Sequence, residues 1–321
     1  MKLRNVAVTG LALLMAVAMS FPAFAAYPEK AVHVVNYVAP GGLMDVTSRK
    51  FISIAQKYEP KVTFVIENVT GAGGLVGLGH VLQQPADGYT VFAATTAVVD
   101  KVIATKKDEN ELIWSMEWVT MLMRDPECVI GAADGEFNTF EKVVANAKEL
   151  NGEQLWSGPA PGGNDHILAT KVWKAAGIKG KWVPYKSGPE AMMGTLSGQS
   201  VAYVGNPADM AGRPGYVILG LCRSERLPQF PDAPTFKELG YEGLENEIMW
   251  RGFAIKKGAP EEVYTWWENL NKKIAKDPEW VEYLTRDGID VVDWGRKEFT
   301  EQVKADVEGA KVALREAGLL Q

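Results

Sequence analysis

The stretch VHVVNYVAPGG, residues 32–42, is a β-rich run that ends in a glycine turn, and apolar residues at helical spacing follow it. The stretch PAPGGN, residues 159–164, likewise follows a strand-like run and precedes a helical pattern over residues 165–176. Two matching strand-to-helix junctions so far apart in the sequence predict two α/β lobes rather than one long sheet.

Strand-like and helix-like runs alternate along the rest of the chain. The further strand-like runs are residues 62–66, 89–94, 127–131, 181–185, 201–204, 217–220 and 249–255. The further helix-like runs are residues 75–83, 140–150, 190–196, 261–276 and 297–317. Strands separated by helices of this length imply parallel sheets that are covered by helices on both faces.

The first 25 residues are typical of a secretory leader. Lys2 and Arg4 give a basic start, an apolar run follows, and Ala23 and Ala25 place small residues where a signal peptidase reads them. We therefore expect cleavage before Ala26 and a mature protein in the periplasm. The alternative is an uncleaved anchor helix, because the apolar run is almost long enough to span a bilayer.

The composition is that of a globular protein with an acidic surplus. The chain has 321 residues, of which 47% are hydrophobic and 23% charged, so it is long enough for two cores. Without the leader it carries 32 basic and 40 acidic residues, a net charge of −8. This balance speaks against nucleic acid as a partner, and it means that a bound anion needs local donors.

Two cysteines, Cys128 and Cys222, lie in strand-like runs far apart in the sequence. In an oxidising compartment they form one disulfide or stay as two buried thiols, and the sequence leaves both alternatives open. Neither cysteine has a second cysteine or a histidine at metal-ligand spacing, so we expect no zinc site and no other metal.

Each glycine turn is suited to hold an anion. The first N–H groups of a helix have no intrahelical partner and lie at the positive end of the helix dipole, so a carboxylate or phosphate fits there. Gly41 and Gly42 in the first turn, and Gly162 and Gly163 in the second, let an anion approach without a Cβ atom in the way. Asn164 is a candidate cap of the second helix. A plain tight turn is the alternative for either pair taken alone.

A third glycine-rich turn, residues 71–77, does not match a dinucleotide-binding fingerprint. Val76 occupies the sixth position, where the fingerprint needs glycine. The next strand ends in Thr95 and Thr96, where an acidic residue would hold a ribose. We therefore expect no nucleotide cofactor, and we expect no other cofactor.

Residues suited to catalysis are few. The chain contains three histidines, and it has neither a Gly-x-Ser-x-Gly elbow nor a His-Glu-x-x-His helix. His166, with Asp165 beside it and Ser157 upstream, allows a catalytic triad and hence a secreted hydrolase as an alternative function. We expect instead that His166 hydrogen-bonds its own loop at the start of a helix.

Several short segments stand in one order along essentially the whole mature chain. They are YPEKAV (27–32), APGGLMD (39–45), ENVTGAGG (67–74), PADGYT (85–90), VPYK (183–186), GQ (198–199), LP (227–228), PDAPTF (231–236), WRG (250–252) and GAP (258–260). In order and spacing these segments resemble the solute-binding proteins of tripartite tricarboxylate transporters, the Bug family.

The resemblance implies a two-lobed α/β periplasmic binding protein of the type II architecture. Each lobe would be a mostly parallel sheet flanked by helices, with the ligand in the cleft between the lobes. We expect residues 26–123 and 239–321 in the first lobe and residues 124–238 in the second. Such a protein, which we expect to be a monomer, captures a small organic carboxylate and delivers it to membrane permease subunits.

In that family the ligand carboxylate lies between the two helix-opening loops, held by backbone amides, hydroxyls and water. Carried onto this sequence, the implied site residues are Tyr37, Ala39, Gly41, Gly42, Asp45, Gly73, Gly74, Thr95, Thr96, Gly162, Gly163, Asn164, His166 and Asn206. Two departures leave the ligand's identity open: Gly163 stands where the family usually has Ser or Thr, and the usual Asp after the Gly-Gln turn is absent. An exported sensor domain that feeds a signalling partner is an alternative role.

Overall fold

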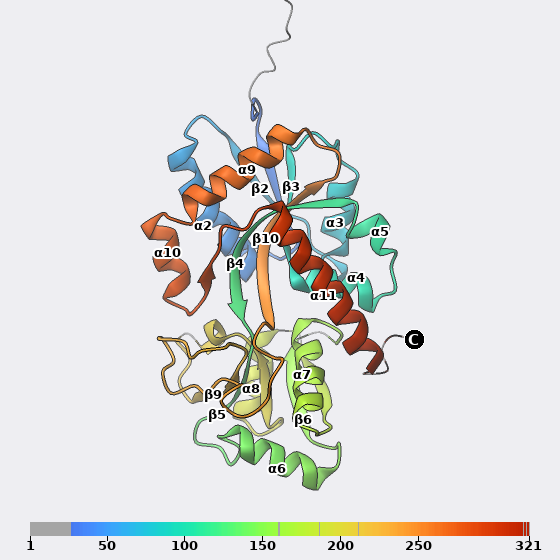
Figure 1. Cartoon of the computed structure of the whole chain (residues 1–321), viewed down its shortest axis with the longest axis vertical. Coiled ribbons are helices and arrows are strands. Elements are labelled where there is room, and N and C mark those ends of the chain that lie inside the picture. Colours follow the sequence, from blue (N-terminus) through green and yellow to red (C-terminus); the bar gives the residue numbers. More distant parts are fainter. Residues whose placement is uncertain are drawn as a thin grey trace, which may run out of the picture.

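The computed structural model describes residues 27–159, 161–185, 187–210, 212–316, 318 and 320. The predicted leader and its cleavage site before Ala26 lie outside these residues, as do Ala160 and Lys186. The described chain forms two α/β lobes joined by a narrow waist (Figure 1). None of the helices in these segments has the length and apolar character that a membrane crossing requires.

The first lobe is built on a six-stranded sheet in the order β11-β4-β10-β3-β1-β2. Its strands are β1 (Val32–Asn36), β2 (Phe64–Asn68), β3 (Thr90–Thr95), β4 (Met116–Pro126), β10 (Ile248–Lys256) and β11 (Asp290–Val291). β1 pairs in parallel with β2 and β3, so that Val34 lies opposite Ile66 and Val91. β10 pairs antiparallel with β3 and β4, and β11 pairs antiparallel with β4.

The second lobe is built on a five-stranded sheet in the order β7-β6-β8-β5-β9. Its strands are β5 (Cys128–Ala132), β6 (Leu155–Pro159), β7 (Lys181–Tyr185), β8 (Ala202–Gly205) and β9 (Tyr216–Leu221). β6 is parallel to β7 and β8, and β5 is antiparallel to β8 and β9. Both lobes therefore follow the predicted α/β plan, with parallel pairing in the half of each sheet that carries a glycine turn.

Helices cover both sheets. The first lobe contains α2 (Leu43–Tyr58), α3 (Leu75–Leu82), α4 (Thr96–Ala104), α5 (Glu109–Leu112), α9 (Glu261–Ile274), α10 (Pro278–Thr285) and α11 (Arg296–Glu316). The second lobe contains α6 (Phe140–Leu150), α7 (Asn164–Ala175) and α8 (Gly188–Leu196). A short 3₁₀ turn lies in each lobe, at Ala72–Gly74 in the first and at Pro207–Met210 in the second. Successive residues of β1 point to opposite faces, so Val34 packs in the core under α2 and α9, and Val35 in the core under α4 and α11.

Two chain segments cross between the lobes, and they hydrogen-bond each other. The first crossing is Glu127, between β4 and β5, and the second returns from β9 to β10 and ends at Glu247. The Glu127 N–H donates to the Glu247 carbonyl oxygen at 3.1 Å, and the Cys222 N–H donates to the Glu127 carbonyl oxygen at 2.9 Å. Backbone hydrogen bonds therefore connect the two crossing segments at the waist.

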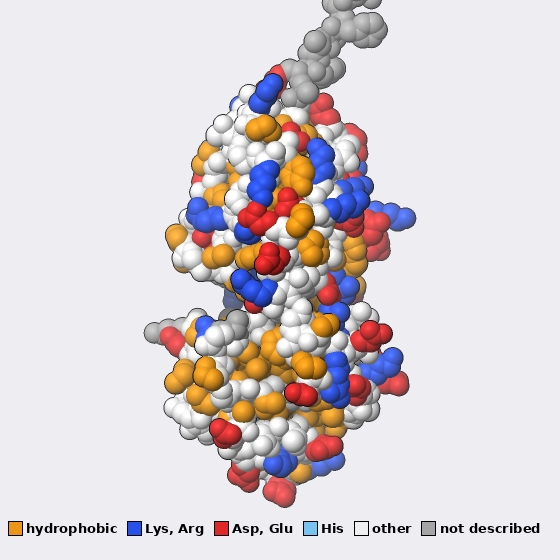
Figure 2. All heavy atoms as spheres, turned by 90° about the vertical axis from the view of Figure 1, so that its left-hand side faces the viewer, with side chains coloured by type: hydrophobic (Ala, Val, Ile, Leu, Met, Phe, Trp, Pro, Cys, Tyr) orange, Lys and Arg blue, Asp and Glu red, His pale blue; other side chains and the backbone are white. Residues whose placement is uncertain are grey.

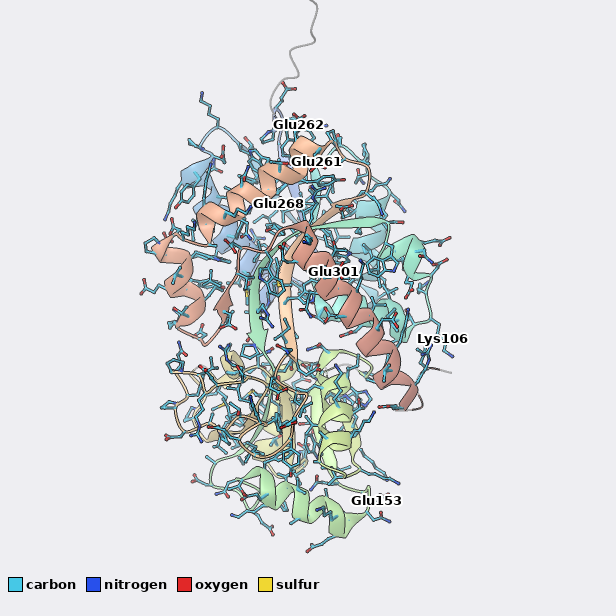
Figure 3. All side chains as sticks on the ribbon, in the orientation of Figure 1. Lys106, Glu153, Glu261, Glu262, Glu268 and Glu301 are labelled. Atoms are coloured by element: carbon cyan, nitrogen blue, oxygen red, sulfur yellow. The ribbon has the colours of Figure 1, made fainter. Side chains whose placement is uncertain are left out.

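The last helix, α11, extends from the first lobe toward α7 of the second lobe (Figure 1). At its start, the Arg296 N–H donates to Glu268 Oε1 of α9 at 2.9 Å, and Arg296 Nη1 donates to Glu261 Oε2 at 3.0 Å. Figure 3 shows both glutamates along α9. At its far end, Glu316 accepts from Lys174 of α7 at 2.6 Å, so α11 connects the two lobes beside the waist.

Both cysteines are buried free thiols, which decides between the two alternatives left by the sequence. Burial raises the pKa of Cys128 and of Cys222 well above the usual value, because the surrounding apolar atoms disfavour the thiolate. Neither thiol is therefore activated for redox chemistry.

Candidate ligand-binding site

The first loop (residues 39–45) is held in shape by its own helix. Gly41 takes the left-handed conformation with φ +80°, which glycine adopts without strain. Its N–H donates to Asp45 Oδ2 at 2.9 Å, in the first turn of α2. The first intrahelical hydrogen bond runs from Val46 N to Gly42 O at 3.0 Å. The amides of residues 43–45 therefore have no intrahelical acceptor, which leaves them available to an anion.

Asp45 is a buried support of the first loop. It is 1% exposed, accepts from Arg49 Nε at 3.0 and 3.1 Å, and accepts from Asn68 Nδ2 at 2.9 Å. The Arg49 guanidinium and the hydrogen bond from Gly41 lower the pKa of Asp45 to about 2. The carboxylate stays ionised at neutral pH, and Arg49 balances its charge.

The second loop (residues 158–166) repeats this arrangement with a different side chain. Gly162 has φ +75°, and its N–H donates to His166 Nδ1 at 3.0 Å, in the first turn of α7. The His166 ring stacks on Trp182, with ring centroids 4.8 Å apart and an interplanar angle of 15°. Burial lowers the pKa of His166 to about 4, so the imidazole is neutral and accepts at Nδ1. The predicted contact of His166 with its own loop is confirmed.

The N-cap glycines, Gly42 and Gly163, differ from the glycines that precede them. Gly42 has φ −66° and Gly163 has φ −85°, and neither cap makes a side-chain hydrogen bond. In α7 the first intrahelical bond runs from Ile167 N to Gly163 O at 3.0 Å, which leaves the amides of residues 164–166 without an intrahelical acceptor. The two loops thus present equivalent helix starts, one from each lobe.

Tyr37, Gly74 and Thr95 form a packed unit that connects β1, the third glycine turn and α4. Tyr37 Oη and Thr95 Oγ1 lie 2.6 Å apart and share a hydrogen bond. A Cβ atom on Gly74 would lie 2.6 Å from Val98 Cγ2 and 3.0 Å from Tyr37 Cδ2, so only glycine fits there. The preceding Gly73 is exposed. Gly74 is thus a packing requirement that positions the Tyr37 ring.

The implied residues Asn164 and Asn206 converge on the first crossing between the lobes. Asn164 Nδ2 donates to Glu127 Oε1 at 2.5 Å, and Asn206 Nδ2 donates to the same oxygen at 3.3 Å. Asn206 Nδ2 also donates to the Pro126 carbonyl oxygen at 3.0 Å. The crossing residue Glu127 therefore links the start of α7 to the end of β8.

Two implied residues of the first lobe differ in exposure. Ala39 is exposed in the first loop, whereas Thr96, the first residue of α4, is buried. Thr96 Oγ1 accepts from the Trp250 N–H at 3.2 Å, which fixes the start of α4 against β10. The Thr96 oxygen therefore already has a donor within the chain.

Further carboxyl groups surround Glu127. Burial and the neighbouring carboxyls raise the pKa of Glu127 well above its usual range and that of Asp165 to about 8. Asp209 accepts from Tyr203 Oη at 2.7 Å. Like charges in a buried group cannot all ionise together, so part of this group is protonated at neutral pH.

A buried ion pair precedes Glu127 by two residues. Asp125 on β4 accepts from Arg251 on β10, with Oδ2 and Nη1 3.2 Å apart, and the side chains are 0% and 2% exposed. Burial raises the pKa of Asp125 to about 7 in spite of the guanidinium. Removing one partner of such a pair typically costs about 3–5 kcal/mol, so this pair is a structural requirement of the two crossing strands.

The geometry required for a catalytic triad is not formed by the candidate residues. Ser157 Oγ bonds to Thr195 Oγ1 at 3.0 Å and to Ser200 Oγ at 2.9 Å, and it is 0% exposed. His166 uses Nδ1 to accept from Gly162. Among the described residues, Ser157 and His166 make no hydrogen bond to each other, which is the contact that activates a nucleophile.

Two concave features lie where the lobes meet. The molecular surface is hollowed between the two lobes in Figure 2. A separate cavity of about 330 Å³ is lined by Thr96 and Asp100 of α4, Asn164 and Lys171 of α7, and Asp306 of α11. Thr96 and Asn164, which are implied site residues of opposite lobes, therefore line one cavity.

Residues 54–319 of this chain match the family model of the tripartite tricarboxylate transporter family receptor. The chain belongs to this family. A relative from Bordetella pertussis, protein BugT, is 26% identical over 220 residues, which is 67% of each chain. The predicted family is thereby confirmed.

Solved structures of similar fold confirm the two-lobed architecture of this tripartite tricarboxylate transporter receptor. Rpa4515 of R. palustris with adipate has a TM-score of 0.80 at 19% identity, covering 91% of this chain and 98% of that one. MatC (Rpa3494) from Rhodopseudomonas palustris with bound malate has a TM-score of 0.74 at 18% identity, covering 90% and 100%.

Sequence reasoning about this receptor missed the charged residues at its waist. Arg251 lies inside a strongly apolar, strand-like run, whereas Asp125 stands between Arg124 and Pro126. A charge within a buried strand needs a partner, so the position of Arg251 was a usable signal. Glu127 carried no such signal, because its partners Asn164 and Asn206 come from distant parts of the chain.

Proposed function

We propose that this protein captures a small organic carboxylate between its two loops and delivers it to membrane permease subunits. The observation that supports this most strongly is the matched pair of helix starts. Each places three amides without an intrahelical acceptor behind a glycine N-cap, and the positive ends of two helix dipoles favour an anion there. The structural neighbours with adipate and malate support a carboxylate as the ligand class.

We place the lobes slightly differently from the sequence-based division. β4 stays in the first sheet as far as Pro126, which supports a first crossing at Glu127. Leu239 and Leu244 pack in the core of the second lobe, which supports a second crossing near Glu247 rather than at residue 239. Cleavage before Ala26, a periplasmic location and a monomeric state complete this proposal.

We infer that the receptor binds its ligand without changing it. The neutral His166 ring is engaged by Gly162 and Trp182, and Ser157 belongs to a separate hydroxyl network. This arrangement supports a role in transport or in sensing over the hydrolase alternative. Transport is favoured because the chain belongs to a transporter receptor family.

A thermal-shift screen of organic acids tests the proposal. A ligand that binds only the folded protein stabilises it by about 2.7 kcal/mol at 100 times its dissociation constant. We expect a few clear hits, each recovered unchanged after incubation, as measured by mass spectrometry. No stabilisation by any di-, tri- or amino carboxylate would contradict carboxylate capture, and conversion of a hit by the pure protein would favour the enzyme.

A further inference from the structure

Two buried carboxyl groups meet where the first crossing reaches the start of α7. Glu127 is 1% exposed and Asp165 is 6% exposed, and the Asp165 carboxyl hydrogen-bonds Glu127. Ionised carboxylates have only acceptor oxygens, so this hydrogen bond requires a proton on one of the two groups. Glu127 and Asp165 therefore share a proton, and with it the pair carries at most one negative charge.

The other contacts of Glu127 favour keeping this proton. Asn164 Nδ2 and Asn206 Nδ2 both donate to the same oxygen of Glu127, Oε1. With both carboxyls ionised, Glu127 Oε2 is buried and has no donor among the described residues. A buried oxygen without a donor is costly, whereas a protonated Asp165 gives Glu127 a further donor.

Further acidic groups face the pair from the elements packed around it. They are Asp100 of α4, Asp125 of β4, Cys128 of β5, Tyr203 of β8, Asp209 of the 3₁₀ turn in the second lobe, and Cys222 after β9. Burial raises the pKa of Tyr203 and of both thiols well above their usual values, so these three groups are neutral at pH 7. The remaining groups are carboxyls, and each of them disfavours a second negative charge on the pair.

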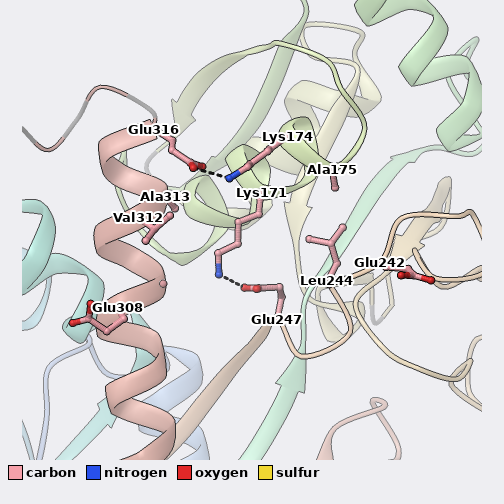
Figure 4. A pocket seen from close by; sticks show the side chains of 12 residues that line it. Lys171, Lys174, Ala175, Glu242, Leu244, Glu247, Glu308, Val312, Ala313 and Glu316 are labelled. Carbon is pink, nitrogen blue, oxygen red and sulfur yellow. Dashed lines mark hydrogen bonds and ion pairs between the residues drawn. The ribbon is translucent and has the colours of Figure 1, made fainter.

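The cations nearby are already paired with other carboxylates. Arg251 pairs with Asp125 at 3.2 Å, and Lys171 Nζ donates to Glu247 Oε2 at 2.6 Å, as Figure 4 shows. Loss of the shared proton would therefore add a buried negative charge that neither of these cations balances.

The pair lies at the helix start where we place the solute carboxylate. Asp165 is the second residue of α7, and its own amide is one of the three that have no intrahelical acceptor. Two unit charges about 6 Å apart, at the effective dielectric constant of a protein surface, change an equilibrium by about a hundred-fold. A bound anion and a second negative charge on the pair therefore strongly disfavour each other.

We propose that the receptor captures its anionic solute together with a proton, which it holds between Glu127 and Asp165. The proposal rests on the proposed function, because it needs the solute carboxylate at the start of α7. Burial and the neighbouring carboxyls raise the pKa of Asp165 to about 8, and a bound anion raises it further. Affinity should therefore be high below about pH 8 and fall as pH rises through this value, where binding takes up a proton.

Isothermal titration calorimetry of the mature chain with L-malate and with adipate tests this proposal. Both acids are dianions at pH 7 and at pH 9, so the charge of the ligand does not change. We expect the dissociation constant of at least one acid to be at least ten-fold higher at pH 9. Titrations at pH 8.5 in phosphate and in Tris, which differ in ionisation enthalpy, should show uptake of about half a proton or more.

Two isosteric variants remove the shared proton without removing the hydrogen bond. Asp165→Asn places an N–H donor against Glu127, and Glu127→Gln keeps an oxygen for Asn164 and Asn206. Each should reduce the ratio of the dissociation constants at pH 9 and pH 7 below three-fold and abolish proton uptake. The exposed Asp134→Asn in the same lobe is the matched control and should keep the wild-type ratio. Tm without ligand at pH 7 reports whether each variant folds.

Three outcomes would overturn the proposal. A wild-type ratio below three-fold would do so and leave carboxylate capture intact, as would a wild-type ratio in both Asp165→Asn and Glu127→Gln. Absence of binding by both acids at pH 7, where affinity should be high, would also overturn it, and the wider acid screen then decides the proposed function separately. If neither variant folds, proton uptake by the wild type decides the proposal.

Discussion

The two loops have the same backbone arrangement, but a different side chain supports each of them. In each, a left-handed glycine donates its N–H to a side chain four residues later, to Asp45 in the first loop and to His166 in the second. Asp45 is an ionised carboxylate held by Arg49, whereas His166 is a neutral ring held by stacking on Trp182. The shared geometry therefore belongs to the glycine turn and the helix start, and the fourth residue only has to accept a hydrogen bond.

In both loops, one glycine shapes the loop and the next glycine stands beside the amides that are available to the ligand. The positive-φ glycines Gly41 and Gly162 spend their amides inside the loop. The N-cap glycines Gly42 and Gly163 stand next to the amides that have no intrahelical acceptor. Substitutions at the N-caps should therefore affect the ligand, and substitutions of the fourth residue should affect the loop.

We expect the largest loss of ligand binding from Gly163→Val. Gly163 is extended, with φ −85° and ψ 177°, so a β-branched residue fits its backbone while its side chain blocks an anion at α7. We expect loss of the ligand-induced thermal shift with little change in Tm of the unliganded protein. Gly79→Val is the control, because a Cβ atom there meets no atom within 4 Å.

Gly42→Val sharpens this comparison by adding a steric cost. A Cβ atom on Gly42 would lie 3.1 Å from the Ala39 carbonyl oxygen and 3.1 Å from Val38 Cγ2, so the first loop itself must shift. We expect Gly42→Val to abolish the thermal shift and also to lower Tm without ligand. Full ligand affinity in both valine variants would show that the carboxylate is not held at these two helix starts.

A smaller effect is expected from removing the support of the first loop. Asp45→Ala leaves the Gly41 N–H, Asn68 and Arg49 without their shared acceptor, so the free energy of unfolding should fall by about 2 kcal/mol. Urea denaturation of the unliganded protein measures this change. Glu153→Ala is the control, since its pair with Lys181 is exposed and is worth less than about 1 kcal/mol. Equal effects of the two variants would contradict the support role of Asp45.

Most of the fold could be predicted where local signals and packing agree. The helix predicted at residues 140–150 is α6 (Phe140–Leu150), because Thr139 caps it and its apolar residues share one face. α4 was missed because its β-branched residues have low helix propensity, and its helical form depends on the Thr95 cap and on packing against α11. β4 was missed because it is buried on both faces and shows no alternation.

The candidate site divides in the same way. The glycine turns of both loops are local features, so the sequence predicted where each helix begins. The waist depends on tertiary contacts, since Glu127 meets Asn206 only after the chain has passed through the second lobe. Asp100 was missed because α4 itself was not predicted, and because the cavity that Asp100 lines involves both lobes.

The smallest expected effect is a difference between the two loops in how their stability depends on pH. His166 has a folded pKa of about 4, below its ordinary value, so between about pH 6.5 and pH 4 only the unfolded chain binds this proton. Stability contributed by the neutral ring is therefore lost as pH falls through this window. Asp45, with a pKa of about 2, loses its contribution only below about pH 4.

His166→Asn should remove the acid-dependent loss from the second loop while keeping an acceptor for Gly162. The measurement is the difference in Tm between variant and wild type from pH 7 to pH 4.5, because carboxyls with raised pKa, such as Asp165, add the opposite slope to both proteins. We expect the difference to move in favour of the variant as pH falls, with a modest loss of ligand affinity at pH 7. The control is His80→Asn in α3. A pH-independent difference in Tm would mean that His166 does not lose stability by protonation in this window. Near-total loss of ligand binding would mean that the His166 ring contacts the ligand and that the two loops do not share a support role for their fourth residue.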